Sequence, residues 1–429
     1  MKGKLLKILI AVFAVALIAP AFSAVENVKV GGDVAIYGVI RGKYALPTND
    51  YHNFFQTSAR VYVSADLSEN VSAMVRLINE RDWGYRDTGT GIYLDLGYIQ
   101  VKDLLTPGLN LTVGRQEIQL GEGLVIGSAY NAFYNASSRN YNYPVALAAK
   151  DLGLQKAFDA VKIDYTASAI PLSVTAFLST INEQLWTDQT LLGLNLGYKV
   201  ADIADLEVYY VRDDNYKNND KANLDTAGIR VVSKIPAIEN FNLKGEYAKQ
   251  FGDDGTNDYE GSALLLGGEY KFSANMEPAI KVNYLILSGD EKNPTTGDHK
   301  DWQMVFPSNI GSRIGPLFYA YSAWNYDKKN IKLEESNLKV LNLGFSLKPV
   351  EKLTLSLDGY WLKTDEKVAV GANSYDKIGK EIDLGIEYKH TEDLVFGLSL
   401  GKIFADDLIK KGFEGKDAWQ TIASMKVSF

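Results

Sequence analysis

The chain has 429 residues and a net charge of −8, and it is rich in tyrosine (26) and glycine (37). A chain of this length makes about two or three soluble domains or one large barrel. Because cysteine is absent, disulfides and thiolate metal sites are excluded, and three histidines leave little scope for histidine-based catalysis.

Residues 1–24 have the pattern of a signal peptide. Three lysines precede an apolar run over residues 8–18, and a proline and several small residues follow. This order predicts cleavage after Ser23 or Ala24, and the proline argues against a retained membrane anchor. The mature chain, residues 25–429, loses those lysines and carries a net charge of about −11. We therefore expect one exported domain that binds no nucleic acid.

Most of the mature chain alternates between apolar and polar residues. In the C-terminal segment, Trp419, Ala423, Met425, Val427 and Phe429 fall on one face, and mostly polar residues lie between them. A period of two predicts strands with one apolar and one polar face. No stretch of the mature chain approaches the ~18 uninterrupted apolar residues that a membrane helix needs.

The connections between the predicted strands alternate between two lengths. Eight are short, such as LSEN and HTED, and nine are long. The long set includes residues 121–154 and 288–336 and the stretches NEQLWTDQ, DDNYKNNDKAN and TDEKVAVGANSYDK. Seventeen connections join 18 strands and put both termini on the short-turn side.

These lengths predict an all-β fold: a transmembrane antiparallel up-and-down β-barrel of 18 strands with short periplasmic turns and long extracellular loops. We therefore place the protein in the bacterial cell outer membrane. A soluble β-sandwich or propeller is the alternative that the two-length spacing disfavours.

The predicted barrel must close, because an open sheet edge is not tolerated in lipid. We expect the last strand to pair with the first and its apolar face to contact outer-membrane lipid. The terminal Phe429 resembles the signal read by the barrel-assembly machinery, which is a second expected partner. No flat apolar patch stands out, so we expect a monomer. We expect aromatic girdles from strand-end residues: Tyr44, Trp83, Trp186, Tyr209, Tyr210, Tyr270, Trp361, Tyr388 and Trp419.

A barrel of this size leaves an aqueous lumen, so passage of a solute is the expected function. Arg41, Arg60 and Arg76 fall on the first three strands, on the face opposite to lipid, and we expect a positive stripe near mid-height. Further inward cations are expected at Lys162, Arg230, Lys271 and Lys281. Such a stripe attracts carboxylates. Alternatively, the cations form a salt-bridged wall with Glu80, Asp95, Asp164 and Glu269.

The longest motif begins at residue 114 with the sequence GRQEIQLGEGLVIGSAYNAF. In porins a loop at this place often folds inward and narrows the pore. Its aromatic and amide side chains suit sugars, and Arg115 and Arg139 are placed to meet acidic groups. Alternatively, this loop and residues 288–336 form a packed plug without a recognition role.

This motif resembles the Gly-Arg-Gln strand and following loop of the alginate-export family of outer-membrane porins. The resemblance implies an 18-stranded channel. It also implies that the characteristic residues of the family correspond to Gly114, Arg115, Gln116, Ile126, Gly127, Asn131 and Arg139. Phe306 and Pro307 match a second landmark. The match departs from the family pattern because an arginine before Leu124 and a tryptophan near Tyr130 are missing. It covers about thirty residues and does not identify the solute.

We expect a channel for passive transport of anionic or polyhydroxylated solutes, such as a uronate or an oligosaccharide. The alternatives are a general, weakly selective diffusion porin and a plugged barrel that acts as a structural protein or adhesin. We expect no enzymatic activity, because His52, His299 and His390 fall in loops and turns without an adjacent serine. No cofactor is expected, apart from calcium bound by Asp and Asn side chains of residues 212–220 and 252–260.

Overall fold

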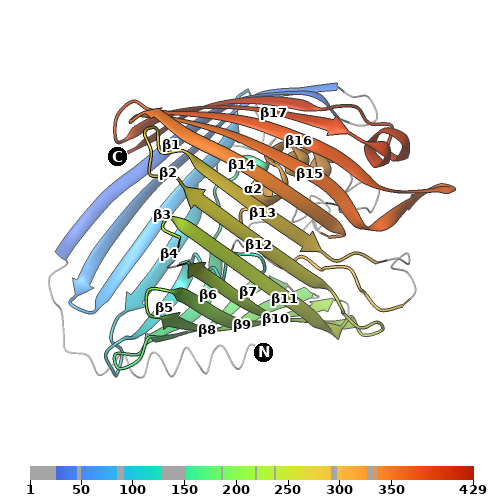
Figure 1. Cartoon of the computed structure of the whole chain (residues 1–429). Coiled ribbons are helices and arrows are strands. Elements are labelled where there is room, and N and C mark those ends of the chain that lie inside the picture. Colours follow the sequence, from blue (N-terminus) through green and yellow to red (C-terminus); the bar gives the residue numbers. More distant parts are fainter. Residues whose placement is uncertain are drawn as a thin grey trace.

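The computed structural model describes the barrel and most of its loops (Figure 1). The described residues are 26–45, 50–84, 91–127, 150–184, 187–217, 220–235, 238–290, 297–325, 333 and 336–429. The predicted signal peptide, Trp186 and Arg139 lie outside these residues.

A single antiparallel sheet of 18 strands forms the molecule. The strands are β1 (Glu26–Ala45), β2 (Asp50–Ser68), β3 (Val71–Asp82), β4 (Tyr93–Val101), β5 (Leu109–Gln116), β6 (Phe158–Thr166), β7 (Leu172–Gln184), β8 (Thr187–Val200), β9 (Ala204–Lys217), β10 (Asp220–Lys234), β11 (Phe241–Asp253), β12 (Ser262–Lys271), β13 (Ala279–Leu287), β14 (Leu338–Val350), β15 (Leu353–Val370), β16 (Asn373–Lys389), β17 (Leu394–Ala405) and β18 (Trp419–Ser428).

Each strand pairs with its neighbours in sequence, and β1 closes the barrel against β18. Their register runs from Asp33 opposite Ser428 to Gly42 opposite Trp419. The backbone of Phe429 completes the seam by donating to, and accepting from, Gly32 at 2.9 Å in both directions. The predicted strand number and the predicted pairing of the first and last strands are therefore confirmed.

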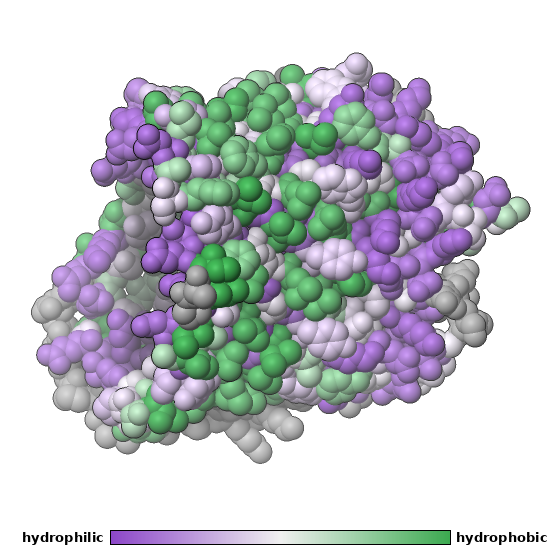
Figure 2. Space-filling model, viewed as in Figure 1, coloured by the Kyte–Doolittle hydropathy of each residue, from purple (hydrophilic) through white to green (hydrophobic). Residues whose placement is uncertain are grey.

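The outer face of the wall is apolar. Exposed residues such as Leu194, Ile229, Leu343, Ile382 and Met425 alternate with inward-facing ones. In Figure 2 the hydrophobic residues gather across the middle of the visible wall, and hydrophilic ones gather toward the long-loop end. This distribution fits an outer face that contacts lipid. No helix among the described residues is long and apolar enough to cross a membrane.

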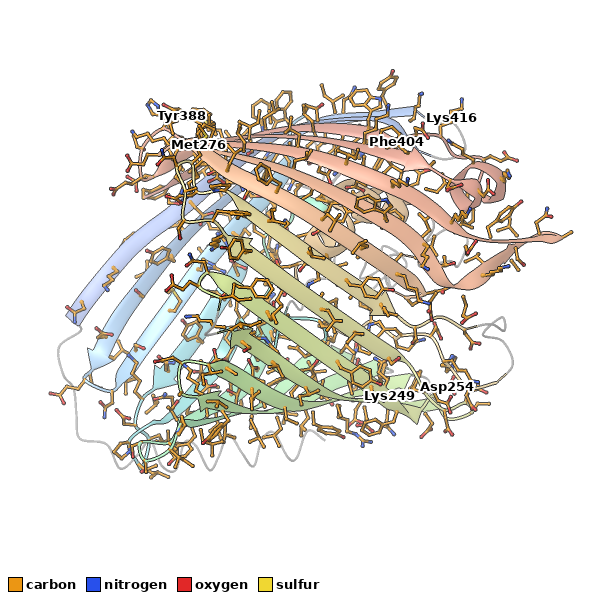
Figure 3. All side chains as sticks on the ribbon, in the orientation of Figure 1. Lys249, Asp254, Met276, Tyr388, Phe404 and Lys416 are labelled. Carbon is orange, nitrogen blue, oxygen red and sulfur yellow. The ribbon has the colours of Figure 1, made fainter. Side chains whose placement is uncertain are left out.

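The two ends of the barrel differ as the sequence predicts. Figure 3 places Met276 and Tyr388 at the short-turn end and Asp254, Lys249 and Lys416 at the opposite end. We assign the short-turn end to the periplasm.

The prediction of a long loop is wrong at three places. The strands on both sides continue through NEQLWTDQ, DDNYKNNDKAN and TDEKVAVGANSYDK, which leaves gaps of two residues between β7 and β8, β9 and β10, and β15 and β16. These hairpins extend beyond the apolar band of the wall. Because both faces of a strand meet water there, the alternation of apolar and polar residues is lost.

The two longest connections are residues 117–157, here called L3, and residues 288–337, here called L7. Parts of both that the structure describes lie in the lumen and line its cavities. L3 contains the short helix η1 (Lys150–Leu152), and L7 contains α2 (Ile310–Ile314) and α3 (Pro316–Asn325). Figure 1 shows α2 inside the barrel. A further helix, η3 (Leu408–Gly412), lies in the last long loop.

A buried apolar cluster joins the inward loops to the wall. It includes Trp302, Phe306 and Phe318 of L7, and it also includes Tyr44 and Tyr209. Those two tyrosines are only 1% and 2% exposed, so their expected place in the aromatic girdles is wrong. Both rings face the lumen. L7 covers Tyr44, and the hydroxyl of Tyr209 donates a hydrogen bond to the wall carboxylate Glu246.

Candidate functional site in the barrel lumen

Backbone hydrogen bonds tie L3 to L7 inside the barrel. Phe306 donates to the Val125 carbonyl at 2.9 Å, and Gly127 donates to the Phe306 carbonyl at 2.7 Å. Ser308 donates to the Gly123 carbonyl at 2.9 Å. Gly127 allows this approach, because a Cβ there would lie 2.2 Å from the Ser308 hydroxyl. The two sequence landmarks thus form one structural unit, here called the L3–L7 bridge.

The wall anchors the other end of L7. Glu381 of β16, fully buried, accepts hydrogen bonds from the backbone N–H groups of Leu317 (2.9 Å) and Phe318 (2.7 Å). These groups belong to the first turn of α3, whose N–H groups have no partner within the helix. On the far side, the Tyr44 hydroxyl donates to the Ala320 carbonyl. L7 is therefore fixed both to L3 and to two distant strands.

A cavity of about 450 Å³ lies between the inward loops and the wall formed by β10 to β13. Its cations are Arg230, Lys244, Lys281 and Arg313, and its carboxylates are Glu122 and Glu269. The amides of Gln119, Asn242, Asn283 and Asn309 complete the polar lining. We call this space the basic cavity. Lysine, arginine and amide side chains together suit a solute that carries a carboxylate and hydroxyl groups.

Glu122 of L3 occupies the centre of the cations. Arg230 donates to one of its oxygens through Nε (2.9 Å) and Nη2 (2.6 Å), and Lys244 donates to the other at 2.9 Å. Burial raises the pKa of Glu122, but these hydrogen bonds outweigh that effect, so its pKa lies below the ordinary value. The basic cavity therefore already binds one carboxylate, supplied by the protein.

Carboxylates of the wall also pair with the cations of the basic cavity. Glu207 accepts from Arg230 at 2.5 Å, and Asp358 accepts from Lys281 at 2.8 Å. Arg313 of α2 donates to the backbone carbonyls of Glu122 and Gly123, which fixes this part of L3. Lys244 and Lys281 remain accessible, with 39% and 44% of their side chains exposed.

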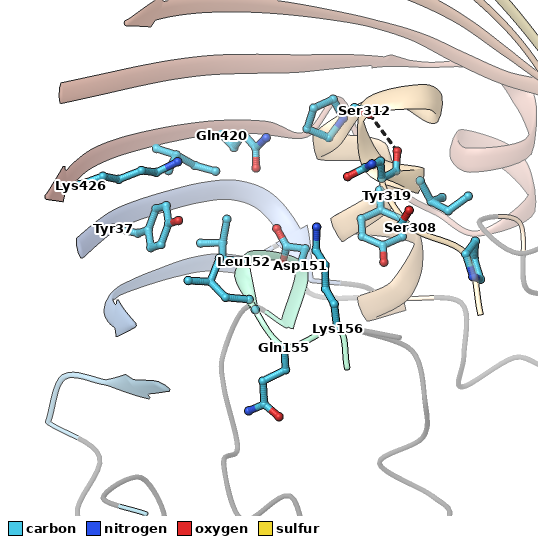
Figure 4. Close-up of a pocket in the computed structure, with 18 residues that line it drawn as sticks. Tyr37, Asp151, Leu152, Gln155, Lys156, Ser308, Ser312, Tyr319, Gln420 and Lys426 are labelled. Carbon is cyan, nitrogen blue, oxygen red and sulfur yellow. Dashed lines mark hydrogen bonds between the residues drawn. The ribbon is translucent and has the colours of Figure 1, made fainter. Parts of the chain in front are cut away.

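A second cavity, of about 410 Å³, lies on the other side of L7, against β1 and β18 (Figure 4). Asn309 and Ser312 line both cavities, so the segment that begins α2 separates them. The lining is mostly neutral, with Tyr37, Tyr319, Gln420 and several backbone groups beside Asp151 and two lysines. Hydroxyl and amide groups at this spacing suit a polyhydroxylated solute.

The predicted stripe of Arg41, Arg60 and Arg76 faces the lumen, but it is not a level row. Arg60 lies opposite Asp33 and Arg41 lies opposite His52, so the two are eight residues apart along β1, roughly 26 Å. The expectation that all three share mid-height is therefore wrong, because counting from turns ignores the stagger of the strands.

Each of these arginines is held by a carboxylate. Arg41 pairs with Asp151 of η1 at 2.6 Å and is 1% exposed. Arg60 pairs with Asp33 at 3.0 Å. Arg76 pairs with Asp95 at 2.5 Å and Glu117 of L3 at 2.7 Å. This part of the lumen therefore matches the salt-bridged wall that the sequence left open, and two of its pairs also fasten L3.

Arg115 is not a lumen residue, and its assignment to the pore lining is wrong. The register places it opposite Asp159, with which it pairs at 3.0 Å. Both lie on the face of exposed Ile163, whereas the neighbouring Gln116 and Phe158 face inward. The side chains of the Gly-Arg-Gln motif thus alternate between the two faces, and the inward Gln116 donates to the Thr112 and Ala160 carbonyls of the wall, both at 3.1 Å.

The remaining predicted cations are inward. Lys162 pairs with Asp164 on its own strand at 2.9 Å, and Lys271 pairs with Glu269 at 3.3 Å. Of the predicted cations, Arg230 and Lys281 alone reach the basic cavity among the described residues.

Sequence reasoning missed Glu122, Lys244 and Arg313. Lys244 shares the inward parity of Glu246 in the stretch NLKGEYAK, so alternation along β11 was a signal for it. Glu122 and Arg313 lie in loops, where no period exists, and only the fold brings them to the wall.

The expected calcium ligands are the Asp and Asn side chains of residues 212–220 and 252–260. No three His, Asp or Glu side chains in the described part of the chain gather closely enough to hold an ion. Asp254 instead accepts from the backbone of Thr256 and Asn257 at 2.8 Å and contacts His299 at 2.9 Å. These bonds lower the pKa of Asp254 to about 2, with the hydrogen bond from His299 as the largest cause.

A closed barrel with an apolar outer face and a polar lumen narrowed by two loops, in a chain that a porin family model matches, defines an outer-membrane porin, a channel and not an enzyme. The family model described as alginate export matches residues 90–416. The chain therefore belongs to the alginate-export family, and it is a protein of the bacterial outer membrane.

Several solved structures share this fold. OccK11 (OpdR) of Pseudomonas aeruginosa has a TM-score of 0.60 at 10% identity, covering 94% of this chain and 96% of that one. OprD of the same organism has a TM-score of 0.58 at 13% identity, covering 96% and 97%. OccAB4 of Acinetobacter baumannii has a TM-score of 0.57 at 11% identity, covering 94% and 98%. No curated protein is a significant match in sequence.

Proposed function

We propose that this porin passes small solutes that carry a carboxylate and several hydroxyl groups, such as a uronate or a short acidic oligosaccharide. The observation that supports this most directly is the position of Glu122, whose carboxylate is bound by Arg230 and Lys244 in the basic cavity. A site that holds a protein carboxylate with three charge-assisted hydrogen bonds has the geometry to hold a solute carboxylate.

Entry of the solute proceeds by exchange. Glu207 and Asp358 belong to the wall, whereas Glu122 belongs to a loop and is the carboxylate that can leave without opening the barrel. The solute carboxylate takes its place on Arg230 and Lys244, and the amides of Asn242, Asn283 and Asn309 meet its hydroxyl groups. The cavity volume of about 450 Å³ falls within the range of small-molecule sites, roughly 300–1,000 Å³.

Calorimetric titration with galacturonate tests this exchange. Glu122→Gln removes the competing carboxylate, so we expect affinity to rise about tenfold. Glu117→Gln is the matched control, because it removes an arginine-bound carboxylate from the same loop outside the basic cavity. The double variant Arg230→Gln/Lys244→Gln should abolish binding. Equal effects of the two glutamate variants, or equal binding of neutral galactose, would contradict the proposal.

A plugged barrel is the second candidate, and one observation favours it. L3 and L7 contribute apolar residues to a continuous buried cluster that includes Trp302, Phe306, Ile314 and Phe318. Such packing resembles a folded core more than a loose constriction. Electrical conductance distinguishes the two candidates, because a structural barrel passes no current.

A further inference from the structure

Five lysines lie close together on the outer face of β14, β15, β16 and β17. The register sets Lys339 opposite Lys363, and Lys363 opposite Lys377. Lys380 lies opposite Trp361, one step from this line, and Lys402 lies opposite Trp419. Residues directly opposite each other in a sheet have Cβ atoms about 5 Å apart. We call these five side chains the lysine row.

The inward neighbours show that the row faces outward. Leu362 and Thr364, on either side of Lys363, are 3% and 2% exposed and face the lumen. Ile403, next to Lys402, is fully buried. Lys363, Lys377, Lys380 and Lys402 are all exposed.

The row marks the extracellular edge of the apolar band. On β15 the outward residues Leu357 and Trp361 are 49% and 41% exposed, and Lys363 follows them toward the long-loop end. On β16 the outward Ile382 precedes Lys380 in the same direction. The Lys402 ammonium lies 4.9 Å from the ring of Phe404, which Figure 3 places toward the long-loop end. Lysine stems thus lie on apolar wall while their charges reach the headgroup level.

Charge within the row is mostly uncompensated. Lys339 pairs with Asp365, but no ion pair among the described residues involves the other four lysines. Outward arginines elsewhere on the wall are paired: Arg212 with Asp214 at 2.8 Å, and Arg115 with Asp159 at 3.0 Å. Like charges directly opposite each other destabilise a sheet. An anionic partner at this place removes that cost.

We propose that the lysine row binds the phosphate groups of a glycolipid in the outer leaflet of the outer membrane. The charge is complementary to phosphate, and the row continues directly into wall that contacts acyl chains. One glycolipid molecule can therefore contact both the lysine row and the apolar wall. Its phosphates contact Lys363, Lys377, Lys380 and Lys402. Its acyl chains lie against Trp361 and Ile382.

Native mass spectrometry of the detergent-solubilised barrel, titrated with diphosphoryl lipid A, tests this site. The variant Lys363→Gln/Lys377→Gln/Lys380→Gln/Lys402→Gln should lose at least about tenfold in affinity. The matched control replaces four exposed lysines at the short-turn end, namely Lys102, Lys199, Lys234 and Lys389, and should bind as the native protein does. Heat-dependent gel mobility shows that each variant is folded.

Equal losses in the two quadruple variants would overturn the proposal, because net charge alone would then explain binding. Equal binding of lipid A without phosphates would overturn the role of phosphate. Competition by inorganic phosphate at the same concentration as lipid A would overturn the lipid as the partner.

Discussion

Glu122 differs from the wall carboxylates of the lumen because a loop carries it. Its partners Arg230 and Lys244 come from β10 and β11, more than a hundred residues away in the chain. The ion pairs therefore act as a latch between L3 and the wall, and the same latch occupies the basic cavity. One carboxylate thus links the position of the loop to the availability of the site.

The stability of the latch should depend on pH in the acid range. The pKa of Glu122 in the folded protein lies below its ordinary value of 4.5. A lowered pKa means that the latch contributes its full stability above about pH 4.5 and loses it as the pH falls through the lowered pKa. Single-channel recordings should therefore show steady current from pH 8 to 5 and frequent fluctuations in more acidic solution. Glu122→Gln should fluctuate at pH 7, and unchanged currents in that variant would contradict the latch.

Among the elements, α3 depends most on its surroundings. Its sequence, PLFYAYSAWN, is apolar on nearly all sides, so no helical period marks it in the sequence. Glu381 and the buried cluster fix it instead. The strands were predictable because lipid on one side and water on the other impose alternation. That signal ends where the hairpins of β7–β8, β9–β10 and β15–β16 leave the membrane.

Removing the anchor of α3 should release L7. Glu381→Ala leaves two buried backbone N–H groups without an acceptor, which costs about 3 kcal/mol. We expect limited proteolysis within L7 to become roughly a hundredfold faster, since cleavage follows the population of the open state. The control is Glu387→Ala, which removes an exposed carboxylate from the same strand. If both variants are cleaved at the native rate, Glu381 does not hold the loop.

At the scale of the whole molecule, the sequence predicted the barrel better than its interior. Strand number and closure follow from alternation and from the order of short and long connections. The pairing of the cations does not follow from the sequence, because the partners are distant in the chain. Arg41 and Asp151, for example, are 110 residues apart. Lumen charge is therefore a property of the folded loops, and the predicted arginine stripe proved to be mostly neutralised.

The central claim is that the lumen conducts and selects through the basic cavity. Planar-bilayer recording of the purified barrel in a salt gradient tests it most directly. We predict discrete openings, a reversal potential that favours anions, and block by galacturonate but not by galactose. Folded barrels that carry no current would show that L3 and L7 form a permanent plug. Large currents without selectivity or block would show that the basic cavity binds no solute.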